Sequence, residues 1–332
     1  MAGYKESKVG VIDRFLMKIK AIDGSLIWSK TFPSLKKGKS SAFESIVLTS
    51  ENALLLTGVT GARYSAVEGF KSYGNPSEGY AFALYLSPET IARKKAPKMA
   101  DWEKVYENTL TGKSIEEIGS SKEFVLVGSS HEPTVAKLLK INRSGKILWE
   151  KKFPQHGEVT DLAVSKDGIF LSGHKGGWET GIDGSLSKVS DDGNLIWNKT
   201  FGNPSGGENV YADLGRGNSK LIFDECWSVT TVDKFDAIMA CGTGIEACAG
   251  HTGSIKKECE SDPRLNWRSY LAKIDADGRL VWEVASSFSF PEEESDDLPS
   301  TASEWVFTTK NGDLASVVDL DFGFGLEILG LN

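Results

Sequence analysis

One short phrase recurs along this 332-residue chain and constrains its fold more than any other feature. Each copy predicts an alternating apolar strand, a turn centred on Gly, and a second strand entered through Trp. A repeat of this kind cannot bury its own apolar face and must stack on its neighbours, so its period sets the architecture. The four clear copies are KIKAIDGSLIWSKTF (18–32), KINRSGKILWEKKF (140–153), KVSDDGNLIWNKTF (188–201) and KIDADGRLVWEVASSF (273–288), and a degenerate copy with a stretched turn occupies 85–106.

A second signature follows each Trp strand. It consists of an apolar strand, a polar turn and an apolar strand that usually ends near Gly, at 43–58, 115–128, 159–173, 225–242 and 303–318. Five hairpins of each kind amount to about twenty short strands, and a four-strand period favours a β-propeller over a sandwich or barrel. We therefore expect an all-β, five-bladed β-propeller of four-stranded blades. Because the chain starts with a Trp hairpin and ends with a Gly hairpin, the N- and C-terminal hairpins are expected to complete one blade and remove open edges.

The expected organisation is a single β-propeller domain over residues 1–332. Residues beyond the repeat period are interpreted as loop insertions at 59–79, 87–101, 202–223 and 243–268. The 35 glycines and 9 tryptophans fit a turn-rich β protein. A net charge of −8 argues against nucleic acid and anionic membranes as partners, and no apolar run is long enough to span a bilayer.

The Trp hairpins resemble the tryptophan-docking, quinoprotein-like (PQQ-like) β-propeller repeat, whose phrase is apolar-x-Asp-x-x-Gly-x-apolar-apolar-Trp. The best match is Ile274, Asp275, Gly278 and Trp282. The resemblance implies blade geometry and covers most of the chain. This chain departs from the family in having five expected blades where eight are usual, and it lacks the adjacent cysteine pair that often floors the quinone site. We therefore expect no quinone cofactor, and the tryptophans are interpreted as packing between blades.

All four cysteines lie in one window, at Cys226, Cys241, Cys248 and Cys259. The absence of a CxxC pair and of suitably spaced histidines disfavours zinc. Two disulfides are expected: Cys248–Cys259 would close a small loop, and Cys226–Cys241 would join adjacent strands of one hairpin. Buried, reduced thiols are the alternative. Disulfides would indicate a secreted or lumenal protein, and reduced thiols a cytoplasmic one.

Each Gly hairpin opens with a strand that carries an acidic residue. The strands FESIVL, IEEIGS, TDLAVS, ECWSVT and SEWVFT carry an acid at their first or second letter, and we interpret Glu44, Glu116, Asp161, Glu225 and Glu304 as one column. If the opening strands line a central channel, these carboxylates converge. They would then bind a cation such as Ca²⁺, or carry raised pKa values suited to general acid catalysis. The structural alternative is that each accepts backbone N–H groups at the strand entrance.

The loops expected on the same rim hold all four histidines of the chain. Clustered histidines can bind metal or transfer protons, and an aromatic ring can stack on a sugar. The candidate ligand-binding residues are His131, His156, His174, Trp178 and His251. Ordinary solvent-exposed side chains are the alternative.

No nucleophile elbow, Walker loop, HExxH or dinucleotide fingerprint occurs in the sequence. The leading prediction is therefore a non-catalytic propeller scaffold that binds a protein partner, and such a scaffold predicts an exposed apolar patch on one face. The alternatives are a cation-dependent module that binds a small ligand or glycan, and a hydrolase or lyase that uses the channel carboxylates.

Overall fold

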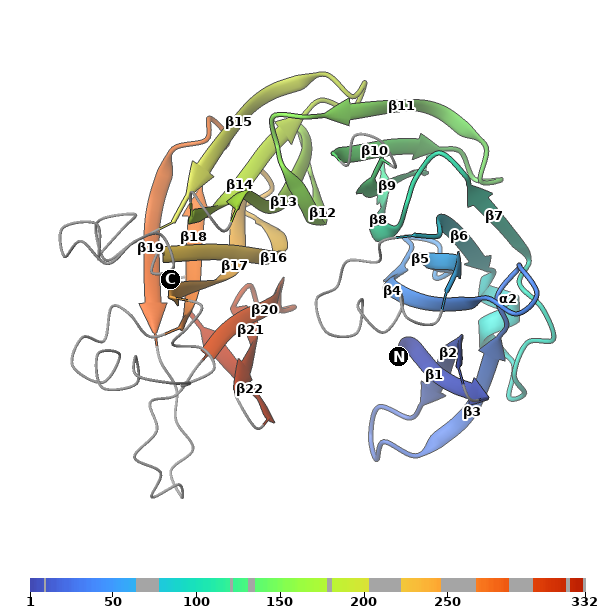
Figure 1. Cartoon of the computed structure of the whole chain (residues 1–332). Helices are drawn as coiled ribbons and strands as arrows, with labels where there is room; N and C mark the ends of the chain where they lie inside the picture. Colours follow the sequence, from blue (N-terminus) through green and yellow to red (C-terminus); the bar gives the residue numbers. More distant parts are fainter. Residues whose placement is uncertain are drawn as a thin grey trace. The chain divides into compact units, whose positions relative to one another are not determined.

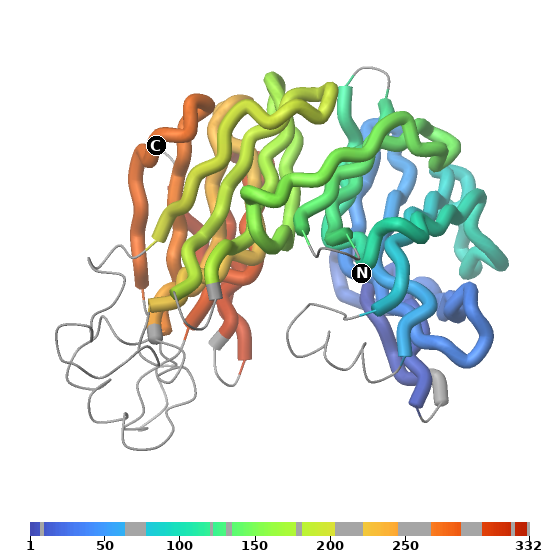
Figure 2. Tube along the Cα trace, turned by 45° about the horizontal axis from the view of Figure 1, so that its top comes forward, coloured from blue at the N-terminus to red at the C-terminus, as the bar shows by residue number. Residues whose placement is uncertain are grey.

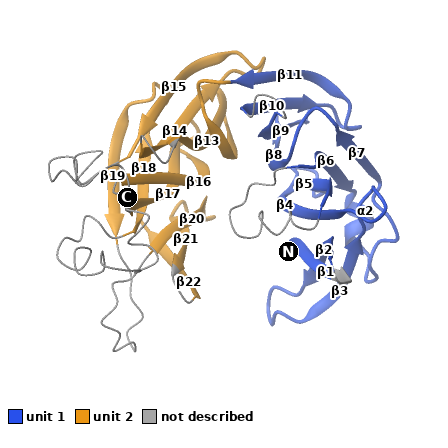
Figure 3. Ribbon diagram, viewed as in Figure 1, with its two compact units in different colours: residues 1–153 blue, residues 154–332 orange. Residues whose placement is uncertain are grey.

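A computed structural model describes residues 1–8, 10–63, 78–119, 122–130, 135–177, 181–202, 222–245, 267–286, 301–320 and 323–330. It is an all-β structure, as predicted, in which the described residues form one short helix, α2 (Pro88–Ala92). The chain divides into two compact units, Met1–Phe153 and Pro154–Asn332, coloured separately in Figure 3. Each unit is described by itself.

Unit 1 consists of three antiparallel sheets in which strands that follow one another in sequence are also neighbours (Figure 1). The first is three-stranded, with β1 (Ala2–Lys8), β2 (Val11–Ile19) and β3 (Leu26–Phe32). The second contains β4 (Ser40–Leu48), β5 (Leu54–Ala62), β6 (Tyr80–Leu86) and β7 (Trp102–Tyr106). The third contains β8 (Gly112–Ile118), β9 (Glu123–Ser129), β10 (Ala136–Ile141) and β11 (Ile147–Phe153).

Unit 2 repeats the same four-strand meander (Figure 2). One meander contains β12 (Glu158–Ser165), β13 (Gly168–Gly177), β14 (Gly181–Val189) and β15 (Leu195–Phe201). The next contains β16 (Ile222–Val232), β17 (Asp236–Ile245), β18 (Arg268–Ile274) and β19 (Leu280–Ser286). A single parallel pairing, Ile182 with Phe223, joins the two meanders into one sheet. The last sheet is three-stranded, with β20 (Thr301–Thr308), β21 (Leu314–Leu320) and β22 (Gly323–Leu329).

The core of each unit lies between successive meanders. In unit 1, Leu55 of β5 packs in one buried cluster with Leu126 and Leu139 of the following sheet. In unit 2, Phe170 of β13 shares a cluster with Met239 of β17. Stacking on the neighbouring repeat therefore buries the apolar face of each meander, as the repeat period predicts.

The two ends of the chain differ from the prediction. β2 pairs with β1 and β3, and β21 pairs with β20 and β22, so no described sheet combines strands from both ends. The predicted blade shared by the terminal hairpins is therefore not observed, and the count of five blades is not confirmed. The cause is local: residues 2–8 and 323–329 pair with the strands next to them in sequence, each taking the edge on which the shared blade was expected to form.

The opening strand of every Gly hairpin carries a β-bulge. At the bulge, one residue of the opening strand has no partner in the ladder, and the pairing register shifts by one. The residues passed over by the ladder are Glu44, Lys113, Thr160, Trp227 and Glu304. A bulge brings the backbone of the opening strand close to its partner strand. A Cβ on Gly128 would lie 1.7 Å from the carbonyl oxygen of Thr111, and one on Gly173 would lie 1.9 Å from that of Glu158. The bulge thus explains why these hairpins end in Gly.

Candidate functional site

The bulges align the opening strands with one another and correct the predicted acidic column. Only Glu44 and Glu304 occupy the bulge position; Lys113, Thr160 and Trp227 are their equivalents in the other sheets. The premise that the five carboxylates are equivalent is therefore wrong, and Glu116, Asp161 and Glu225 stand at other places along their strands. Glu116 and Asp161 stand three and one residues after the bulge, and Glu225 stands two residues before it. The copies were aligned on their acidic residues, whereas the structural equivalence is set by the bulge, which no particular residue type marks in the sequence.

In unit 1 the half-buried carboxyl of Glu44 lies near Lys113, its counterpart in the next sheet. Burial raises the pKa of Glu44 to about 8, and the positive charge of Lys113 opposes that rise. The pKa of the Tyr4 hydroxyl is also raised, by burial and then by the charge of Glu44. An acid and an amine at equivalent bulges, rather than a ring of acids, characterise this part of unit 1.

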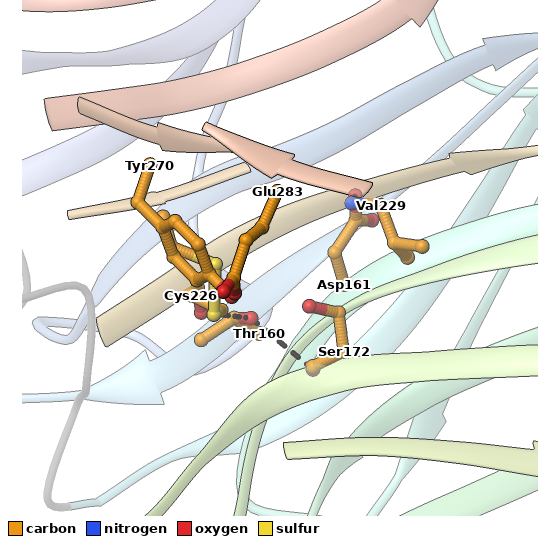
Figure 4. Close-up of a disulfide and its surroundings, with 8 residues drawn as sticks. Thr160, Asp161, Ser172, Cys226, Val229, Tyr270 and Glu283 are labelled. Carbon is orange, nitrogen blue, oxygen red and sulfur yellow. Dashed lines mark hydrogen bonds between the residues drawn. A yellow bond between two sulfur atoms is a disulfide. The ribbon is translucent and has the colours of Figure 1, made fainter. Parts of the chain in front are cut away.

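In unit 2 the buried carboxylate of Asp161 is engaged by the protein itself (Figure 4). One oxygen accepts a hydrogen bond from the backbone N–H of Leu162 at 2.8 Å. The other accepts from the hydroxyl of Ser228 at 2.9 Å and from the backbone N–H of Val229 at 3.0 Å. Asp161 thereby links β12 to β16. Its carboxylate accepts backbone N–H groups, which agrees with the structural alternative to a cation site.

Glu304 lies near two further acids of unit 2. Its pKa is raised by desolvation and then by the negative charges of Asp319 and Glu225. Among the described residues of either unit, no three His, Cys, Asp or Glu side chains are grouped so that they could hold a metal ion. The Ca²⁺ site built on all five carboxylates stays a prediction.

Two of the predicted rim histidines are near one another in unit 2. His156 is fully buried, with Nδ1 2.8 Å from the Ser187 hydroxyl, and burial lowers its pKa to about 4. A neutral imidazole that is buried in the turn between β11 and β12 and bonded to a hydroxyl of β14 favours a structural role over a ligand site. His174 is partly exposed and places Nε2 3.4 Å from a carboxylate oxygen of Glu158. His131, Trp178 and His251 lie outside the described residues.

The disulfide Cys226–Cys241 is confirmed and joins directly paired residues of β16 and β17 (Figure 4). It stands at the bulge, where Cys241 takes the place that Gly128 and Gly173 hold in their hairpins. The hydroxyl of Thr160 donates to the carbonyl of Cys226 at 2.8 Å and links the neighbouring meander to this pair. The predicted pair Cys248–Cys259 lies outside the described residues, as does most of the insertions 202–223 and 243–268.

The repeated Trp docks on the Gly turn of the following meander. In unit 2 the indole N–H of Trp197 donates to the carbonyl of Ala276 at 3.1 Å, and a Cβ on Gly278 would come within 3.0 Å of the indole ring. In unit 1 a Cβ on Gly145 would lie 2.9 Å from the ring of Trp102. These contacts confirm that these tryptophans pack one meander against the next.

A Lys stands directly across the strand pair from this Trp, a regularity that the sequence analysis missed. Lys18 pairs with Trp28, and the same pairing joins Lys140 to Trp149, Lys188 to Trp197 and Lys273 to Trp282. Three of the lysines also bind a carboxylate: Lys140 with Glu123 at 2.9 Å, Lys188 with Asp167 at 2.8 Å, and Lys273 with Asp233 at 2.9 Å. The signal was present in the sequence, because Lys opens each clear copy of the phrase.

Lys18 differs from the other three lysines. It has no carboxylate partner among the described residues, and its Nζ donates instead to the carbonyl of Ile91 in α2 at 2.8 Å. α2 belongs to the predicted insertion 87–101, which stretches the turn of the second meander and packs against Trp28. Beside Trp28 the structure consequently has a pocket of about 540 Å³ in unit 1. Its lining includes Leu16, Lys18, Trp28, Ile46, Leu54 and Ile91.

The last sheet of unit 2 has one face that is apolar and exposed. Trp305 and Phe307 of β20 are paired through β21 with Leu326 and Ile328 of β22, so their side chains lie on the same face as Phe324. The exposed fractions are 45% for Trp305, 41% for Phe307, 80% for Phe324, 61% for Leu326 and 62% for Ile328. Scattered exposed apolar residues are ordinary, whereas a contiguous set of this kind indicates a binding surface.

Four-stranded antiparallel meanders stacked face to face are the unit from which β-propellers are built, and solved structures similar to the chain are β-propeller proteins. Hydrazine synthase of Kuenenia stuttgartiensis matches with a TM-score of 0.51 and 10% identity, over 92% of this chain and 69% of that one. Such an identity supports the propeller type of fold alone.

Two other solved structures match at lower TM-scores, from which we draw no argument. The β-propeller domain of the Trilobed protease from Pyrococcus furiosus has a TM-score of 0.44 at 10% identity, over 100% of this chain and 79% of that one. An endo-arabinase from Bacteroides thetaiotaomicron has a TM-score of 0.41 at 9% identity, over 86% and 92%. No protein-family model matches the chain, and no curated protein sequence matches it. Within the described residues, no helix is long and apolar enough to cross a membrane.

Proposed function

We propose that the protein is a propeller-type scaffold that binds a partner polypeptide by adding a strand to the outer edge of β22. The observation that carries this proposal is the exposed apolar face of β20–β22, which includes Trp305, Phe324 and Leu326. It corresponds to the exposed patch that an interaction scaffold requires. Trp is among the residues most often found at the energetic centre of protein interfaces.

The outer edge of β22 supports the same proposal. β22 ends the order β20-β21-β22, so no described strand pairs with its outer side. Its sequence, GFGLEIL, contains one charged residue, Glu327. Native proteins usually protect an open edge with charge, Pro or a cover, because the unpaired backbone groups otherwise recruit another strand. An edge strand with this apolar composition is suited to that recruitment.

The chemistry of the partner follows from the sheet. An added strand would satisfy the free backbone groups of β22, and its alternate side chains would lie beside Phe324, Leu326 and Ile328. The partner segment is therefore extended, with apolar residues at every second position. The acids near this sheet, Asp319 and Glu327, favour basic residues at the ends of that segment.

A synthetic peptide of alternating Val and Thr with Lys at both ends tests the proposal. We expect it to bind the intact protein in fluorescence anisotropy. A version N-methylated on the amides that face the edge should lose binding, because it keeps its side chains but cannot pair. Leu326→Lys should weaken binding at least tenfold, while Ile22→Lys, at a residue that is 92% exposed in unit 1, serves as the matched control.

Two results would contradict strand addition. Equal binding of the N-methylated peptide would show that backbone pairing is not used. A dimer that Leu326→Lys dissociates in analytical ultracentrifugation would assign the edge to a second copy of the chain.

Cation-dependent binding is the second candidate function. The negative charges of Asp319 and Glu225 raise the pKa of Glu304, and a cation held by one or two of these acids would relieve that repulsion. A cation present at a hundred times its dissociation constant would stabilise the native state by about 2.7 kcal/mol. Excess Ca²⁺ should then raise the melting temperature relative to chelator. Identical melting in both conditions removes this candidate.

A further inference from the structure

The pair Lys188–Trp197 in unit 2 shows what this motif can bind when the turn of the following meander packs against it. Lys188 and Trp197 are cross-strand partners, and both donate to one oxygen, the carbonyl of Ala276. The distances are 3.2 Å from Lys188 Nζ and 3.1 Å from Trp197 Nε1. An ammonium and an indole N–H placed in this way form a two-donor site for a single oxygen atom.

The pair Lys18–Trp28 in unit 1 has no corresponding acceptor among the described residues. Lys18 and Trp28 are cross-strand partners in the same way, but the insertion that contains α2 replaces the turn that would supply the carbonyl. Trp28 is 6% exposed, and its Nε1 is buried without a hydrogen-bond partner among the residues that the structure describes. A buried donor without a partner is costly in a native structure and calls for an explanation.

No carboxylate of the described residues compensates the charge of Lys18. Its three counterparts bind carboxylates, whereas the hydrogen bond that Lys18 makes within the described part of the chain is to the carbonyl of Ile91. An ammonium has three donors, so two remain for another acceptor. Both groups, Lys18 and Trp28, line the same pocket.

We propose that the unit 1 pocket binds an apolar carboxylate, such as a medium-chain fatty acid. A carboxylate oxygen accepts from Trp28 Nε1 and Lys18 Nζ, in the manner of the Ala276 carbonyl in unit 2. The hydrocarbon chain lies against the apolar lining, which includes Leu16, Ile46 and Leu54. The negative charge distinguishes this ligand from a neutral apolar one, since it supplies the counter-charge that the other three lysines have.

The size and composition of the pocket agree with this class of ligand. Its volume of about 540 Å³ falls within the range of roughly 300–1,000 Å³ that is typical of small-molecule sites. Such sites are mainly apolar with a few polar groups that fix orientation. Asn52 is the other polar side chain in the lining besides Lys18. All lining residues belong to unit 1, so this inference is independent of strand addition to β22.

Isothermal titration calorimetry of the whole chain with decanoate, decanol and decylamine tests the proposal. We expect saturable binding of one decanoate per chain, at least tenfold weaker binding of decanol, and none of decylamine. Decanol has the same chain without the charge, and decylamine reverses the charge. Equal affinity for decanoate and decanol would overturn the proposal, as would the absence of decanoate binding.

Three variants locate the site. Lys18→Met keeps an unbranched side chain one atom shorter and removes the charge, and it should weaken decanoate binding at least tenfold. Ala92→Trp fills the pocket without removing a charge and should abolish binding, which keeps the test decisive if Lys18→Met folds poorly. Lys140→Met is the matched control, because Lys140 occupies the same repeat position away from the pocket. A loss of affinity in Lys140→Met equal to that in Lys18→Met would contradict the assignment.

Discussion

The pair Lys188–Trp197 of unit 2 and the pair Lys18–Trp28 of unit 1 share a sequence phrase and differ in what they contact. Lys188 and Trp197 are satisfied by the turn that contains Ala276 and Gly278, and the Trp ring is in close contact with that turn. Lys18 and Trp28 pack against an inserted segment with a short helix instead, and a pocket lies beside them. We call Lys188–Trp197 the closed pair and Lys18–Trp28 the open pair. The comparison shows that a repeat with one packing function can become a binding site when its neighbour, rather than the repeat itself, changes.

Titration of the buried histidine next to the closed pair should produce the largest effect. His156 contacts Ser187, the residue before Lys188, and burial lowers its pKa to about 4 from an ordinary 6.5. The unfolded chain therefore takes up a proton before the folded one does. Stability should fall as the pH drops from about 6.5 to about 4, by about 3 kcal/mol in total. Urea unfolding of the wild type and of His156→Gln across this range measures it. A variant with an equally steep loss would contradict the prediction.

Substitution of the turn glycine should break the closed contact. Gly278 and Gly24 both have positive φ, at 78° and 67°, so Ala strains the backbone at either position. A Cβ at 278 also meets the Trp197 ring, whereas nothing lies within 4 Å at 24. We expect Gly278→Ala to cost about 2 kcal/mol more than Gly24→Ala, which should cost about 1 kcal/mol. Equal losses in chemical denaturation would show that docking on Trp197 contributes nothing.

Removal of the lysine charge should affect the closed pair more than the open one. The Lys188 side chain is 3% exposed and bonds to Asp167, so Lys188→Met leaves that carboxylate without its cationic partner. The expected loss is about 1.5 kcal/mol, against less than about 0.5 kcal/mol for Lys18→Met. Measuring both variants in the absence of any ligand makes the comparison direct. A larger loss for Lys18→Met would reverse our interpretation of the two environments.

Exchange of the indole for a phenyl ring should give the smallest difference. Trp197→Phe removes a hydrogen bond to Ala276, while Trp28→Phe removes an N–H that has no partner in the described part of the chain. Both variants lose ring area, so only the difference between them is informative. We expect Trp197→Phe to be about 1 kcal/mol more destabilising. Saturation with decanoate should remove that difference by giving Trp28 an acceptor to lose.

Much of the fold could be predicted from the sequence because local signals carry it. Alternating strands, Gly turns and the Trp phrase predicted the meanders, their stacking and the packing of Trp102 and Trp197. The hairpin position of Cys226 and Cys241 predicted their disulfide. Each of these features depends on residues close in sequence or repeated at a constant interval.

The failures concern features that the repeated phrase does not encode. No residue type marks the bulge, so the sequence alone could not show that Glu116 and Glu225 stand away from the bulge position. The strands β1 and β22 escaped prediction because neither contains the repeated phrase. The pocket depends on an unmet hydrogen bond at Trp28, which is a property of packing between repeats that no single repeat reveals.

The bulge in each opening strand has a consequence for how such a protein could change over time. The chain already holds an acid, an amine, a hydroxyl and an indole at this one position, in Glu44 and Glu304, Lys113, Thr160 and Trp227. Five internal copies of the same element thus sample different side-chain chemistries on a single backbone geometry. The position behaves as a variable site in a constant framework, and new binding chemistry can arise there by single substitutions while the architecture is inherited intact.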